Sequence, residues 1–150
     1  MKITAVEAIP YAIPYRKPLR FASGEVSTAE HVLVRVHTDD GVVGVAEAPP
    51  RPFTYGETQA GIIAVIRDVF APQVVGSTLT QGEAIGARIA RTVGNPAAKS
   101  ALDMAMWDAL GRTLGLQVTE LLGGFTDRMR VTHMLGFDEP AAMVAEVDDA

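Results

Sequence analysis

The sequence predicts an α+β domain, in which a three-stranded antiparallel meander comes first and a bundle of helices follows. Two observations carry this prediction. Residues 30–38 alternate between apolar and polar side chains, and the Asp-Asp-Gly turn at 39–41 leads back into a further apolar strand. Residues 94–124 instead carry apolar side chains at three- and four-residue spacing, which is typical of a buried helix.

The meander is predicted from three segments. Residues 2–15 read as an edge strand, because Pro10 and Pro14 have no N–H to donate to a ladder. Residues 30–38 form the middle strand, and residues 42–46 return as its partner. One face of the middle strand carries Val32, Val34 and Val36.

Three shorter helical segments are predicted around the long one. The first begins at Glu57 and ends before Pro72, since a proline cannot continue a helix. The second covers residues 81–92, with Thr80 as its cap. The third is a short turn over residues 116–122.

The long helix has clear predicted ends. Asn95 is a suitable N-cap, Pro96 fits the first helical position, and Gly115 is placed to stop the helix. Asp108 and Arg112 form an i,i+4 pair of opposite charge. The buried stripe is predicted to consist of Ala98, Ala101, Leu102, Ala105, Ala109 and Leu110. We expect this helix to be the scaffold of the domain.

Composition limits the function classes. The 18 acidic and 13 basic residues give a net charge of -5, which argues against a nucleic-acid or anionic-membrane surface. The absence of cysteine excludes a disulfide framework, a thiolate zinc site and a thiol nucleophile. No apolar run reaches the roughly 18 residues that a membrane span needs, so we expect a cytoplasmic protein.

The long helix and the turn after it also carry a family resemblance. The run AAKSALDMAMWDALGRTLGLQVTELLGG at 97–124 resembles the end of the N-terminal cap domain of the enolase superfamily, in its mandelate racemase and muconate lactonizing enzyme branch. Muconate cycloisomerases are the most similar members. The resemblance implies a capping domain over residues 1–126. Residues 127–150 then hold the first strand (130–136) and helix (139–150) of a β/α barrel that is otherwise absent, because a closed barrel takes eight such units.

The resemblance also implies a chemistry that these residues cannot complete. Such enzymes form an enediolate next to a carboxylate, stabilised by Mg²⁺ or Mn²⁺, with lysines as acid and base. The Lys-x-Lys pair and the three carboxylate ligands lie on later barrel strands. Lys2, Lys17 and Lys99 form no such pair. We therefore expect neither catalytic residues nor metal ligands within 1–150, and a longer protein or a second polypeptide that supplies them.

Substrate specificity is the role that this segment can supply. The family's two lid loops match residues 16–24 and 49–57, and both close over a small carboxylate substrate at the barrel mouth. Arginines suit a carboxylate and aromatic rings supply apolar walls. Tyr55 matches a Tyr-Gly pair of muconate cycloisomerases. The candidate substrate-binding residues are Tyr55, Arg51, Phe53, Phe21, Arg20 and, at the end of the barrel strand, Met134.

Several activities remain open at this point. The first interpretation is conversion of cis,cis-muconate to muconolactone in aromatic compound catabolism, by a homo-oligomer of two to eight subunits. Leu19 departs from the muconate cycloisomerase pattern, which has histidine there. Dipeptide epimerase, N-acylamino-acid racemase and o-succinylbenzoate synthase are alternatives in the same superfamily. A non-catalytic α+β module that binds a ligand or partner is the alternative of another class.

Overall fold

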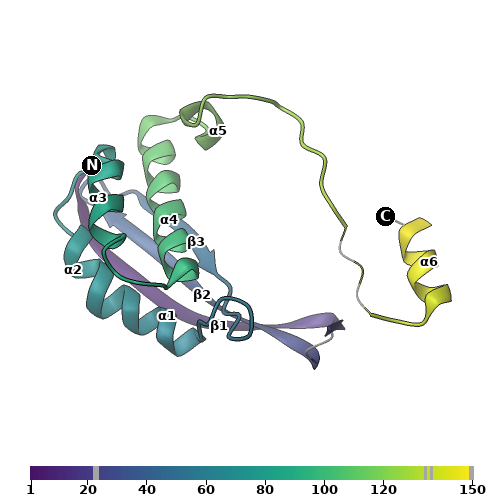
Figure 1. Cartoon of the computed structure of the whole chain (residues 1–150). Coiled ribbons are helices and arrows are strands. Elements are labelled where there is room, and N and C mark those ends of the chain that lie inside the picture. The colour runs from purple at the N-terminus through teal and green to yellow at the C-terminus, as the bar shows by residue number, and fades with distance from the viewer. Residues whose placement is uncertain (22–23, 134, 136, 149–150) are drawn as a thin grey trace. The chain divides into compact units, whose positions relative to one another are not determined.

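The computed structural model describes residues 1–21, 24–133, 135 and 137–148 (Figure 1). By their internal contacts these residues fall into two units. The first joins Met1–Tyr11 to Glu30–Gly124, and the second joins Ala12–Ala29 to Phe125–Ala150. The predicted division into residues 1–126 and 127–150 stays a prediction.

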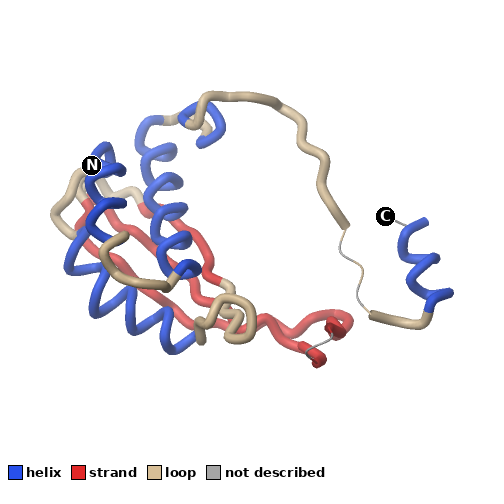
Figure 2. The backbone as a smooth tube through the Cα atoms, viewed as in Figure 1, coloured by secondary structure: helices blue, strands red, loops and turns tan. Residues whose placement is uncertain are grey.

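The three predicted strands form one antiparallel sheet in the order β1-β2-β3, drawn in red in Figure 2. The strands are β1 (Ile3–Phe21), β2 (Gly24–Thr38) and β3 (Val43–Ala48). The register of β2 and β3 runs from Val32 opposite Ala48 to His37 opposite Val43. The predicted meander is confirmed.

The predicted loop at 16–24 is wrong over residues 16–21, which continue strand β1. Its positive charges and Pro18 are typical of a loop, but a strand in a hairpin needs only a partner strand for every second pair of its backbone groups. Pro10, Pro14 and Pro18 are evenly spaced, so their nitrogens face the same side of the strand. Because β1 is an edge strand, one of its sides has no ladder to interrupt.

The first helix differs from its prediction at both ends. Helix α1 (Gln59–Val65) starts after Thr58, whose hydroxyl accepts a hydrogen bond from the Gly61 amide at 3.1 Å. Its path continues through a π-helical segment (Ile66–Phe70) into α2 (Ala71–Val74), which contains Pro72. A π-helical turn changes the backbone pairing locally, and proline needs no N–H in the first turn of the segment that follows.

The second predicted helix is confirmed, but it starts at a different residue and ends earlier than the predicted range 81–92. A 3-10 turn (Leu79–Gln81) precedes helix α3 (Gly82–Ile89). Thr78 and Gln81 form a reciprocal capping box, so Thr78 rather than Thr80 caps this segment.

Helix α4 (Pro96–Leu114) is the scaffold helix that the sequence predicts, and the short helix α5 (Val118–Leu121) follows it. Figure 1 shows α3 and α4 in front of the sheet. The α4 residues Ala98, Ala101, Leu102, Ala105 and Ala109 are fully buried. Their small side chains let β3 come close: a Cβ built on Gly44 would lie 2.1 Å from the Ala105 carbonyl oxygen. Only glycine fits there.

The predicted cap of α4 is wrong. Asn95 adopts a left-handed backbone conformation (φ 57°), and its side chain makes no capping hydrogen bond. The buried carboxylate of Glu57 takes this role: Oε2 accepts from the Ala97 amide at 2.7 Å and Oε1 from the Ala98 amide at 3.1 Å. A negative charge suits the positive end of the helix dipole.

In the second unit, helix α6 (Pro140–Asp148) agrees with the predicted helix. The predicted strand at 130–136 is wrong where it is described, because residues 130–133 and 135 have no regular structure. A parallel barrel strand takes its hydrogen bonds from neighbouring strands, and no described segment pairs with this one. Across the described part of the chain, no helix is long and apolar enough to cross a bilayer.

Candidate functional site

The loop after β3, predicted to close over substrate, is tightly folded in the first unit. The Arg51 carbonyl accepts hydrogen bonds from the amides of Thr54, Tyr55 and Gly56 at 3.0, 2.7 and 3.2 Å. Gly56 has φ 75°, a conformation that glycine adopts at little cost. The loop then closes through a bridge between Arg51 and Glu57. Since Glu57 also caps α4, the base of this loop is fixed to the scaffold helix.

The aromatic side chains of this loop face solvent. Phe53 is 91% exposed and Tyr55 is 52% exposed. Tyr55 also lines a cavity of about 290 Å³. The other lining residues are Glu47, Pro49, Pro96, Ala97, Ser100 and Met104. Exposed rings on a fixed base form a surface that an incoming molecule can cover.

Arg51 is engaged within its own loop. Its guanidinium Nη1 donates a hydrogen bond to the Pro50 carbonyl at 3.0 Å. A guanidinium has five N–H donors, so this bond leaves capacity for a carboxylate.

In the second unit, Arg20 and Phe21 lie at one cavity of about 500 Å³. Gly24, Glu25 and Phe137 complete its lining. The Arg20 Nε donates to the Glu25 carboxylate at 3.0 Å, and the Arg20 carbonyl accepts from the Phe137 amide at 3.2 Å. The predicted carboxylate-binding arginine thus already has an acidic partner, which a substrate carboxylate must replace or share.

A second charged contact joins the end of β1 to the segment before α6. Lys17 Nζ lies 3.1 Å from the Asp138 carboxylate. The Glu139 amide and then the Lys17 ammonium hold the pKa of Asp138 below its ordinary value. In the same unit, His133 Nε2 lies 2.9 Å from Glu146.

The structure brings the predicted site residues together only in part. Arg51, Phe53 and Tyr55 share one loop of the first unit, whereas Arg20 and Phe21 share a cavity of the second. Met134 lies outside the described residues. The substrate-binding roles of all six stay predictions.

The described residues do not fit a metal site, since they contain no group of three or more His, Cys, Asp or Glu side chains that could hold an ion.

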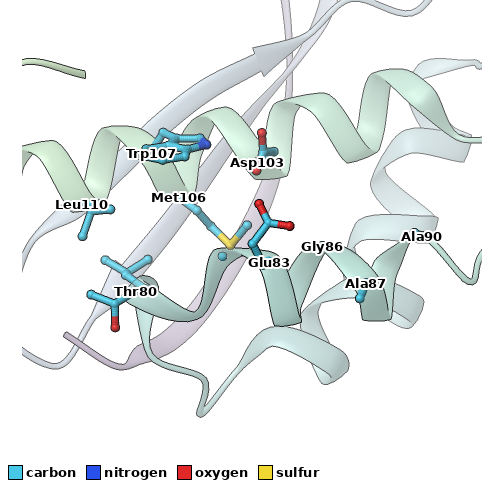
Figure 3. A pocket seen from close by; sticks show the side chains of 11 residues that line it. Thr80, Glu83, Gly86, Ala87, Ala90, Asp103, Met106, Trp107 and Leu110 are labelled. Atoms are coloured by element: carbon cyan, nitrogen blue, oxygen red, sulfur yellow. The ribbon is translucent and has the colours of Figure 1, made fainter. Parts of the chain in front are cut away.

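A groove of about 480 Å³ lies between α3 and α4, away from every predicted site residue (Figure 3). Glu83 and Asp103 face it from the two helices. Burial, and secondarily the negative charge of Glu83, raises the pKa of Asp103 above its ordinary value. The small residues Gly82, Gly86, Ala87 and Ala90 form much of its α3 wall.

Comparison with known protein families identifies the family to which this chain belongs. Residues 3–123 match the model described as "Mandelate racemase / muconate lactonizing enzyme, N-terminal domain". The chain belongs to this family. The resemblance predicted from residues 97–124 is therefore confirmed, and the sheet followed by helices is the N-terminal cap domain of muconate lactonizing-type enzymes.

Individual relatives within the mandelate racemase and muconate lactonizing enzyme family differ in activity. The L-Ala-D/L-Glu epimerase of Bacillus subtilis (strain 168) is 35% identical over 150 residues, which span 99% of this chain and 41% of the epimerase. A crystal structure of a muconate lactonizing enzyme from Mucobacterium smegmatis, complexed with muconolactone, is 72% identical with a TM-score of 0.96. That match covers 99% of this chain and 41% of that enzyme.

A third relative carries a metal. The dipeptide epimerase from Enterococcus faecalis V583, complexed with Mg and the dipeptide L-Leu-L-Tyr, is 31% identical with a TM-score of 0.92. The match covers 99% of this chain and 42% of that epimerase. The chain thus spans about two fifths of the isomerases that it matches.

Two polar side chains, those of Glu57 and Gln59, hold the helices to the sheet or to one another, and the sequence does not predict either contact. The sequence places Glu57 at a helix start, but its carboxylate caps α4. Gln59 donates to two backbone carbonyls of the sheet, at Tyr11 and His31. Both contacts join residues far apart in sequence, so no local pattern indicates them.

Proposed function

We propose that this chain is the N-terminal cap of a muconate cycloisomerase, which converts cis,cis-muconate to muconolactone. The observation that carries the proposal is the 72% identity, over 99% of the chain, to a muconate lactonizing enzyme complexed with muconolactone. The identity to the Bacillus subtilis epimerase is 35% over the same share of the chain.

Within that enzyme, the cap recognises the substrate. Phe53 and Tyr55 offer exposed aromatic surface to the planar carbon chain of muconate. Arg51 offers a guanidinium group to a carboxylate of muconate, and Arg20 is a second, separate candidate for such a contact. Since Arg20 is paired with Glu25, binding at that position exchanges one carboxylate for another. Recognition by the cap therefore selects an anion with an apolar body.

The reacting groups belong to the part of the enzyme beyond this cap. The sequence has no Lys-x-Lys pair, and the described residues do not fit a metal ion. The Mg in the Enterococcus faecalis relative supports a divalent metal in the whole enzyme. The contribution of residues 1–150 is to bind, orient and cover the substrate, as a homo-oligomeric enzyme in the cytoplasm.

The substrate is tested on the full-length protein. Purified enzyme with Mg²⁺ is assayed against cis,cis-muconate, L-Ala-L-Glu, L-Leu-L-Tyr and N-succinyl-L-arginine. We expect kcat/KM for muconate to exceed that for each amino-acid derivative by about 100-fold or more, which is the size of discrimination that a site with dedicated polar partners gives. Faster epimerisation of a dipeptide would assign the epimerase activity instead. Binding without turnover of any substrate would favour the non-catalytic module.

The lid role is tested by Arg51→Ala and Tyr55→Phe. We expect both to raise KM, Arg51→Ala by about tenfold because a charge-assisted hydrogen bond is lost. Arg91→Ala, at an exposed arginine near the end of α3, is the matched control and should leave KM unchanged. Unaltered kinetics in both lid variants contradict the role.

A further inference from the structure

We propose that Gln59 is a positioning residue: it clamps the root of the hairpin Ala12–Ala29 and thereby sets where Arg20 and Phe21 are presented. The chain leaves the first unit after Tyr11 and re-enters it at Glu30. The clamp lies at this crossing and consists of residues of the first unit alone.

Gln59 joins the two strands at the root. It is the first residue of α1, and its Nε2 donates to the Tyr11 carbonyl on β1 at 3.2 Å and to the His31 carbonyl on β2 at 2.9 Å. A primary amide has two N–H donors, and here both are directed at the backbone. One side chain thus ties α1 to both arms of the hairpin where the arms leave the first unit.

A side-chain cluster reinforces the same point. The Tyr11 hydroxyl donates to Glu47 Oε2, and His31 Nδ1 lies 3.4 Å from Glu47 Oε1. The Tyr11 and His31 rings meet edge to face, with centroids 6.0 Å apart. Because Glu47 belongs to β3, the cluster connects all three strands beside Gln59.

The hairpin packs no side chain of its own into a core, and its described contacts beyond the root are polar ones to residues 137 and 138 of its own unit. Among its described residues none is buried, and only Tyr15, Thr28 and Ala29 are partly covered. An isolated two-stranded hairpin whose apolar side chains are exposed is marginally stable in water. The contacts at its root are therefore the ones within the first unit that can restrict its motion, as a hinge restricts a lid.

The clamp does not depend on which substrate the enzyme uses. Its consequence for recognition rests on the proposed function, in which Arg20 and Phe21 contact the substrate. If the hairpin samples many orientations, the substrate binds to it more weakly, because binding must then order the hairpin at a cost in conformational entropy. Loss of the clamp should therefore raise KM and leave kcat largely unchanged.

The test is hydrogen–deuterium exchange of the full-length protein without substrate, comparing wild type with Gln59→Leu. Leucine keeps the bulk of the side chain and removes both donors. We expect amide exchange in peptides covering residues 12–29 to speed up about tenfold, because two hydrogen bonds at the root are lost. Peptides covering residues 32–36 of the buried sheet should keep their rates. Unchanged exchange at 12–29 overturns the proposal.

Two variants separate the clamp from a general loss of stability. Gln73→Leu is the matched control, since Gln73 Nε2 donates to the Val69 carbonyl one helical turn earlier, and it should change neither region. Tyr11→Phe keeps the ring contact and removes the hydroxyl bond to Glu47, so we expect a smaller acceleration confined to residues 12–29. Equal acceleration in both regions with Gln59→Leu or Tyr11→Phe overturns the positioning role.

Kinetics on whichever substrate proves active completes the test. An increase in KM of fivefold or more with kcat within twofold is expected for Gln59→Leu. If muconate is not the substrate, the proposed function fails while the exchange result stands. If the hairpin loosens and KM does not change, the link from clamp to recognition fails.

Discussion

Each of the two units is stabilised internally by a different kind of interaction. The first unit buries a continuous set of apolar side chains between the sheet and α1–α4. The second buries none of its described residues, and polar side chains make contacts there, such as Lys17 with Asp138. Burial stabilises by about 25 cal/mol per Å² of apolar surface, whereas an exposed ion pair contributes about 0–1 kcal/mol. The first unit therefore determines stability, and the second is free to serve recognition.

The largest effect is expected where β3 meets α4. Gly44→Ala places a Cβ within 3 Å of backbone atoms of Ala105 and Ala109, which cannot move without separating sheet and helix. We expect the free energy of unfolding to fall by about 3 kcal/mol or more, measured by urea denaturation. Gly86→Ala is the control: its Cβ meets nothing within 4 Å, so stability should be equal or slightly higher. Equal effects at both glycines would show that close packing does not hold this unit.

A smaller loss is expected at the buried cap of α4. Glu57→Ala removes the acceptor for the Ala97 and Ala98 amides and leaves both N–H groups unpaired. We expect a loss of about 2 kcal/mol in the free energy of unfolding, and about half of that for Glu57→Gln, which keeps one acceptor oxygen. Asn95→Ala should cost about 1 kcal/mol, because alanine tolerates the left-handed backbone less well than asparagine and no cap is lost. A larger loss of unfolding free energy for the Asn95 variant than for the Glu57 variants would show that Asn95, not Glu57, caps α4.

A gain in stability is expected in the groove between α3 and α4. Burial raises the pKa of Asp103, so the folded state binds the proton more tightly than the unfolded state. Stability then falls as pH rises from the ordinary value of 3.8 towards the raised pKa. Asp103→Asn should therefore increase the free energy of unfolding at pH 7 by about 0.5 kcal/mol or less, with no gain below that ordinary value. Denaturation curves at both pH values check this, and a loss at pH 7 contradicts it.

The smallest effect on stability is expected in the second unit. Asp138→Asn removes an exposed charge partner of Lys17, and the denaturation midpoint should not change measurably. Hydrogen exchange in peptides covering residues 137–148 should nevertheless become faster. A clear shift of the midpoint would show that the second unit contributes to global stability after all.

The sequence was informative where one local pattern decides the structure. The alternation at Val32, Val34 and Val36, and the alanine stripe of α4, follow from burying one face, and both predictions are confirmed. The predictions failed where the local structure depends on a residue far away in the sequence. Asn95 has the side chain of a cap, but Glu57, far earlier in the chain, occupies the position.

The substrate-binding roles of the candidate site residues stay predictions, and two contacts around them could not be predicted from the sequence. Phe53 and Tyr55 are exposed, and their place in a lid stays what the resemblance implies. The partner of Arg20 was not foreseen, because Glu25 becomes its neighbour only when residues 16–21 pair as a strand. Gln59 was missed for the same reason, since its acceptors belong to two strands.

The borders of the sheet restrict how copies of this protein can assemble. Along β1, prolines at 10, 14 and 18 leave gaps in the row of backbone donors. Along β3, the Val45 amide is already taken by the Asp108 carboxylate at 2.8 Å. Strand-to-strand extension into a neighbouring molecule is thus disfavoured on both flanks, which favours side-chain surfaces for contacts between copies.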